Sequence, residues 1–115
     1  MKATALFIVA LMAFACGPAV LADHSCAEGA EGLTYETFGR DFLDRSCQRC
    51  HGAVGPDRKG APTAFDFGTQ ASAAAWRERI FARAALDNTT MPPGPDDPSE
   101  EERQKLADWL ACGAP

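Results

Sequence analysis

Apolar residues recur with helical spacing in three segments of the chain. In the first, residues 34–47, Tyr35, Phe38 and Phe42 stand at positions i, i+3 and i+7, and charged residues occupy most positions between them. This spacing puts the three aromatic side chains on one face. It predicts an amphipathic helix that packs against a core.

The other two segments are richer in helix signals. Residues 70–86 are rich in alanine, which favours helix, and Ser99 followed by Glu100–Glu102 forms a capping box that starts a helix continuing to Ala111. Acidic groups in its first turn also suit the positive end of the helix dipole. The apolar faces of these two helices are formed by Trp76, Ile80, Phe81 and Ala84, and by Leu106, Trp109 and Leu110.

Glycine and proline interrupt the chain between the helices. Residues 52–68 and 89–95 contain too many of both to sustain regular structure, and no segment shows the alternation typical of a strand. The sequence therefore predicts an all-α fold of three helices with long loops. Loops this long need something to shape them, and a large apolar cofactor would serve.

The size and charge of the chain limit its function. Its 115 residues allow one domain, and its formal charge is −5. Such an acidic chain repels phosphate, which excludes nucleic acid as a partner and favours a partner with a basic or mostly neutral face.

The N-terminus has the features of an export signal. Lys2 precedes an apolar run, Gly17-Pro18 breaks it, and small residues favour cleavage after Ala22. We therefore expect a signal peptide over residues 1–22, a mature domain over 23–115 and a periplasmic location. Two alternatives keep the protein on the membrane, facing the periplasm: the leader stays as an anchor, or Cys16 is lipidated.

The most specific motif is Cys47-Gln48-Arg49-Cys50-His51, the C-x-x-C-H signature of covalent haem attachment. Two thiols one helical turn apart can each bond a porphyrin vinyl group, and the adjacent imidazole of His51 can bind the iron. A thioredoxin-like dithiol and half of a zinc site are the competing interpretations. The first lacks a predicted sheet, and the second lacks nearby ligands.

A six-coordinate iron needs a second axial ligand. Met91 is the only methionine left after cleavage, and the prolines around it brace its loop, so we expect its thioether to bind the iron. Its alternative role is to fill a gap in the core. His24 is expected to be an ordinary exposed histidine in a mobile segment.

With these motifs, residues 35–112 resemble a class I c-type cytochrome. Members of that family carry a glycine eight residues before the first haem cysteine and a large apolar residue four before it, as Gly39 and Leu43 stand here. The resemblance implies that they pack against Leu106 and Trp109, with Gly39 at the helix crossing.

The resemblance also implies how the proximal histidine is oriented. In the family, the carbonyl of a proline after the motif accepts a hydrogen bond from Nδ1 of that histidine, and Pro62 is similarly placed. Pro56 is a second candidate. Because the helices that Cys26 and Cys112 flank should cross, we also expect a disulfide between these two cysteines.

These patterns together predict an exported one-electron carrier, not an enzyme, with one haem c bound by Cys47, Cys50, His51 and Met91. Its partners would be other redox proteins, and the protein would be a monomer. The alternatives are a haem-based sensor or enzyme with an open iron position, and an electron-relay subunit of a larger respiratory complex. The candidates for neutralising the haem propionates are Arg58, Lys59, Arg77, Arg79 and Arg83.

Overall fold

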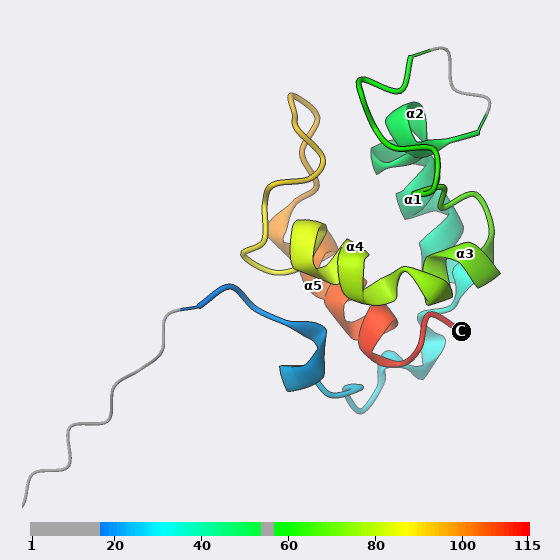
Figure 1. Cartoon of the computed structure of the whole chain (residues 1–115). Coiled ribbons are helices and arrows are strands. Elements are labelled where there is room, and N and C mark those ends of the chain that lie inside the picture. The colour runs from blue at the N-terminus through cyan, green and yellow to red at the C-terminus, as the bar shows by residue number, and fades with distance from the viewer. Residues whose placement is uncertain (1–16, 54–56) are drawn as a thin grey trace, which may run out of the picture.

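The computed structural model describes residues 17–53 and 57–115, and within these ranges it contains helices and no strand (Figure 1). The predicted all-α fold is thus confirmed. Most of the predicted leader and Pro56 lie outside the described residues. The elements are η1 (Leu21–Asp23), η2 (Ala30–Gly32), η3 (Tyr35–Gly39), α1 (Arg40–Ser46), α2 (Gln48–His51), α3 (Gln70–Ala75), α4 (Arg77–Ala84) and α5 (Glu100–Ala111).

The first predicted helix forms in two parts, a π-helical turn η3 that continues into α1. Thr34 starts it, because its hydroxyl accepts a hydrogen bond from the Thr37 N–H at 3.2 Å and the Thr37 hydroxyl accepts one from the Thr34 N–H at 2.9 Å. The N–H groups of both Phe38 and Gly39 donate to the Thr34 carbonyl at 3.0 Å. This shared acceptor widens the first turn before the α-helix begins.

The second predicted helix is wrong in one respect, since it breaks at Trp76 into α3 and α4. Trp76 has φ −99° and ψ 11°, outside the helical region. Its indole packs edge-on against Phe65 with 4.7 Å between ring centroids. A periodic pattern cannot reveal such a break, because residues on both sides of Trp76 still face the core.

The third predicted helix forms as expected. The Ser99 hydroxyl accepts from the Glu102 N–H at 3.1 Å, and the Glu102 carboxylate accepts from the Ser99 N–H at 2.9 Å. The latter hydrogen bond lowers the pKa of Glu102. The predicted capping box therefore starts α5.

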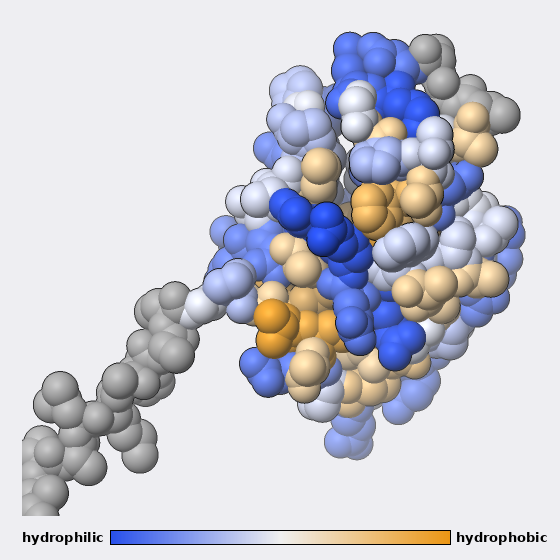
Figure 2. All heavy atoms as spheres, viewed as in Figure 1, coloured by the Kyte–Doolittle hydropathy of each residue, from blue (hydrophilic) through white to orange (hydrophobic). Residues whose placement is uncertain are grey.

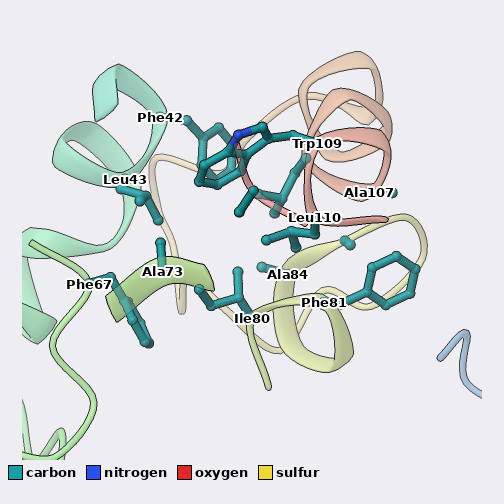
Figure 3. Close-up of a cluster of buried hydrophobic side chains, with 13 residues drawn as sticks. Phe42, Leu43, Phe67, Ala73, Ile80, Phe81, Ala84, Ala107, Trp109 and Leu110 are labelled. Atoms are coloured by element: carbon teal, nitrogen blue, oxygen red, sulfur yellow. The ribbon is translucent and has the colours of Figure 1, made fainter. Parts of the chain in front are cut away.

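The core lies where α1, α4 and α5 meet (Figure 3). Phe42 and Leu43 from α1 pack with Leu106 and Trp109 from α5, and all four side chains are fully or almost fully buried. A Cβ built on Gly39 would lie 2.6 Å from Cη2 of the Trp109 indole. The expected crossing at Gly39 is therefore confirmed, and no side chain fits there.

The two ends of the described chain are joined. A disulfide links Cys26 to Cys112, with 4.6 Å between their Cα atoms, as predicted. The Tyr35 N–H donates to the carbonyl of Pro115 at 2.6 Å. These two links hold the N-terminal segment against the end of α5.

His24 differs from its expected role as an exposed, mobile residue. Its Nε2 lies 3.0 Å from the Asp108 carboxylate, and its ring packs near Phe81 with 5.6 Å between centroids. Its side chain is only 25% exposed. The neighbouring disulfide brings this segment onto α5, a constraint that the local sequence does not display.

Residues before the predicted cleavage site also contact the core. Ala19 and Leu21 pack against it, and the Asn88 side chain donates to the Ala19 carbonyl at 2.9 Å. Cleavage after Ala22 would remove these contacts but leave His24 and the disulfide in place. Within residues 17–53 and 57–115, no helix has the length and apolar character needed to cross a membrane.

We predict that Gly39→Ala destabilises the protein. Overpacking at a close helix contact costs about 1–3 kcal/mol. The higher helix propensity of alanine relative to glycine offsets at most about 1 kcal/mol of this cost. The expected net loss is about 1–2 kcal/mol in the free energy of unfolding, measured by denaturant titration. Gly32→Ala is the control, because nothing lies within 4 Å of a Cβ built there; equal losses in both variants would contradict the crossing.

Candidate functional site

The last four residues of the C-x-x-C-H motif form the single helical turn α2, and Cys47 joins this turn to the end of α1. The Cys47 N–H donates to the Leu43 carbonyl at 2.8 Å and so completes α1. The Cys47 carbonyl in turn accepts from the His51 N–H at 2.9 Å and starts α2. The direction of α1, which packs in the core, therefore sets the orientation of the motif.

The five predicted site residues line one open cavity of about 330 Å³. Cys50 and His51 lie in α2, Cys47 lies at its N-cap, Pro62 lies in the loop after it, and Met91 lies in the loop after α4. Figure 2 shows hydrophobic atoms in the hollow on this face, with hydrophilic groups around them. The apolar side chains in the lining include Phe65, Phe67, Ile80 and Ala84.

The His51 ring is held by a hydrogen bond to the backbone of Phe65, and the expected bond to Pro62 is wrong. Nδ1 of His51 lies 2.8 Å from the carbonyl oxygen of Phe65, not from that of Pro62. The Pro62 carbonyl instead accepts from the Phe65 N–H at 3.1 Å and from Arg58 at 2.9 Å, so it points into its own turn. Since a carbonyl can only accept, Nδ1 carries the hydrogen and Nε2 is left free to bind a metal.

Two more contacts support this histidine. The His51 ring lies beside Phe67, with 4.8 Å between centroids. Gln48, inside the motif, accepts from the Phe67 N–H and donates to Asp66, both at 3.3 Å. Gln48 thus attaches α2 to the loop segment that contains Phe65, whose carbonyl accepts from His51.

Arg58 closes the loop on the other side of α2. Its guanidinium donates to the carbonyls of Gly52 at 2.6 Å, His51 at 3.3 Å and Ala61 at 3.1 Å. A cation at these carbonyls also suits the negative end of the short helix. Neither Gln48 nor Arg58 was predicted to have this role, because their acceptors and donors are mostly backbone groups that carry no sequence signal.

The two thiols do not resemble a dithiol redox pair or a zinc site. Burial raises the pKa of Cys47 to about 12, with a smaller contribution from Cys50. A reactive C-x-x-C pair instead needs a thiol pKa lowered toward neutrality. In the part of the chain that the structure describes, no group of three or more His, Cys, Asp or Glu residues could hold a metal ion.

Met91 is held at the cavity by its backbone. Its N–H donates to the Arg83 carbonyl at 2.9 Å, and its carbonyl accepts from Arg103 at 3.0 Å. The residue is 39% exposed, so it does not fill a gap in the core. A flexible thioether on a tethered backbone at the cavity is well placed to bind a metal.

Basic side chains are concentrated in the cavity lining, although the chain as a whole is acidic. Three of them bond to nearby carboxylates: Arg45 to Asp41 and Glu102, Arg49 to Asp96, and Lys59 to Asp57. The other basic residues of the lining are Arg58, Arg79 and Arg83, whereas the predicted candidate Arg77 is not part of it.

The donor set fits a c-type haem. Two cysteines that form no disulfide, one imidazole with a free Nε2 and one thioether line the same largely apolar cavity. Each of these groups bonds porphyrin or iron in c-type haem sites.

We predict that Arg58→Met loosens the loop around α2. Loss of its hydrogen bonds to four carbonyls should lower the free energy of unfolding by about 1–2 kcal/mol. Hydrogen exchange of the amides near residues 57–62 should become faster. Lys59→Met removes a neighbouring cation that bonds only to exposed Asp57 and serves as the control; equal exchange in the two variants would contradict the role of Arg58.

One family model matches the chain. It describes subunit III of the cbb3-type cytochrome c oxidase, a c-type cytochrome domain, and it covers residues 37–110. Searches of curated proteins and of solved structures found no match. The matched region contains the whole motif, the core helices and Met91. The chain therefore belongs to this family of c-type cytochrome domains, and its cofactor is a covalently bound c-type haem with its iron.

Proposed function

We propose that the protein is an exported one-electron carrier whose haem iron is bound axially by His51 and Met91. One observation supports this most directly. His51 and Met91 belong to segments far apart in the sequence, yet they line the same cavity as the two attachment cysteines. Figure 1 shows α2 and the loop that follows α4 at the same end of the molecule, and residues of both segments line the cavity.

The haem, when bound, supplies a one-electron Fe(III)/Fe(II) couple. The chain's own residues attach the haem, orient the iron ligand and adjust the reduction potential. Cys47 and Cys50 hold the ring covalently, and the bond from His51 to the Phe65 carbonyl keeps Nε2 oriented and basic. Methionine ligation and apolar surroundings both favour the less charged ferrous state and raise the potential.

Arg79 and Arg83 are the best candidates for neutralising the haem propionates. They lie one turn apart on α4 and both line the cavity. Arg79 also lies over the Phe65 ring, 5.3 Å from its centroid. Arg58 is a weaker candidate because its donors already bind loop carbonyls, and Lys59 is weaker because it bonds to Asp57.

The alternative of a sensor or enzyme with an open iron position finds less support. Apart from His51, no histidine belongs to the described cavity lining, so the distal acid/base group of a peroxidase is missing there. Asp96, the only acidic residue in that lining, bonds to Arg49. The second alternative, an electron-relay subunit of a respiratory complex, is favoured by the matched family and is compatible with the same site.

We predict that Met91→Leu opens the iron to external ligands. Leucine keeps the volume and apolar character of methionine but has no thioether. The ferrous variant should bind carbon monoxide rapidly, and the ferric variant should lose the weak far-red absorption band expected for a methionine–iron bond. The wild-type protein should bind carbon monoxide slowly.

Pro93→Ala is the matched control, because Pro93 lines the same cavity and carries no ligand atom. Rapid carbon monoxide binding by the wild type, or an unchanged spectrum in Met91→Leu, would rule out Met91 as a ligand.

We predict that the exported protein begins at Asp23 and carries one haem that resists extraction with acidified acetone. The signal peptide ends in small residues suitable for cleavage, and thioether bonds survive acid. Intact-mass spectrometry measures both properties at once. A mass that retains residues 1–22, or residues 16–22 with a lipid on Cys16, would support a membrane-held form instead.

A further inference from the structure

Arg103 is a buried cation outside the haem motif. It lies on α5, and the residue is only 4% exposed. The carboxylate of Asp97 is 4.0 Å from its guanidinium, and that carboxylate is 58% exposed. Among the described residues, Asp97 is the only carboxylate within 4.0 Å of Arg103, and a buried arginine with so distant and so exposed a partner needs others to offset its desolvation.

Its partners are backbone carbonyls of one segment. A single nitrogen, Nη1 of Arg103, lies 2.8 Å from the carbonyl oxygen of Ala84, 3.2 Å from that of Asn88 and 3.0 Å from that of Met91. These three residues mark the end of α4, the turn after it and the residue proposed to bind the iron. The guanidinium therefore ties the whole connection between α4 and Met91 to α5.

Other hydrogen bonds hold this segment on either side of Met91: the Asn88 side chain donates to the carbonyls of Ala19 and Phe81, and Asp96 accepts from Arg49. The Met91 N–H bonds to the Arg83 carbonyl near the end of α4, and Pro92, Pro93 and Pro95 have no N–H to donate. Tethering of the Met91 carbonyl to the rest of the fold thus depends on Arg103.

We propose that Arg103 is the positioning residue for Met91: its guanidinium holds the Met91 segment closed over the cavity and keeps external ligands from the iron. This inference rests on the proposed ligation by Met91. An external ligand binds only the open form of the segment, so its apparent affinity is reduced by the fraction of molecules that are open. Removal of the guanidinium should raise that fraction.

The test compares holoprotein variants by two readouts. The first is the affinity of the ferric protein for imidazole, and the second is hydrogen exchange of the amides between residues 86 and 98. In Arg103→Met, we expect imidazole to bind about tenfold more tightly or better, the far-red band to weaken and exchange in this segment to become faster. Lys105→Met, which removes an exposed cation from the same helix, should match the wild type in both readouts.

Two further variants keep the test decisive. If Arg103→Met does not fold, Arg103→Lys retains the charge, but its shorter side chain does not reach the position of Nη1, so it should show the same changes in smaller size. In a Met91→Leu background, Arg103→Met should no longer change the imidazole affinity, because the residue it positions has been removed.

Unchanged imidazole affinity and unchanged local exchange in a folded Arg103 variant would overturn the proposal. A uniform rise in exchange over the whole chain would do so too, since it indicates only lower global stability. If the wild type itself lacks a methionine–iron bond, the proposed ligation fails and the positioning role fails with it. The exchange experiment then reports separately whether Arg103 anchors the segment.

Discussion

The close approach of the first helix to α5 at Gly39 and Trp109 is the contact on which the site depends. No Cβ fits between them, so the distance and angle of the two helices are set by backbone and indole. The Cys47 N–H still bonds to the last turn of α1, so α2 follows the direction of that helix. The disulfide between Cys26 and Cys112 holds the N-terminal segment that precedes the first helix at the end of α5. The haem-binding turn is therefore oriented by the core rather than by its own loop.

The long loops are held by arginines instead of regular structure. Prolines and tight turns leave these loops with more backbone acceptors than donors, because each proline lacks an N–H. A guanidinium supplies five donors and no acceptor, which suits this imbalance. Arg58 binds carbonyls around α2, and Arg103 binds carbonyls around Met91. Arg58 thus holds the loop beside His51, and Arg103 holds the loop that contains Met91.

The features that the sequence predicted depend on local or covalent rules. Helical periodicity and the Ser99 capping box predicted the helices, and the C-x-x-C-H spacing predicted haem attachment. The errors concern non-local contacts. The acceptor for His51 is the backbone of Phe65, and any residue in that loop has a carbonyl. Trp76, where the second helix breaks, packs against Phe65 of a loop, and His24 lies against α5 near a disulfide that joins its segment to that helix.

The distribution of charge changes what the net charge suggested about partners. The chain carries a formal −5, which alone favours a basic or neutral partner. At the cavity, however, arginines and a lysine outnumber the single acidic residue in the lining. Three of these cations already bond to carboxylates, and the two on α4 are the residues proposed to neutralise the haem propionates. This face should therefore be close to neutral once the haem is bound, so apolar contact and shape should guide docking there more than long-range attraction.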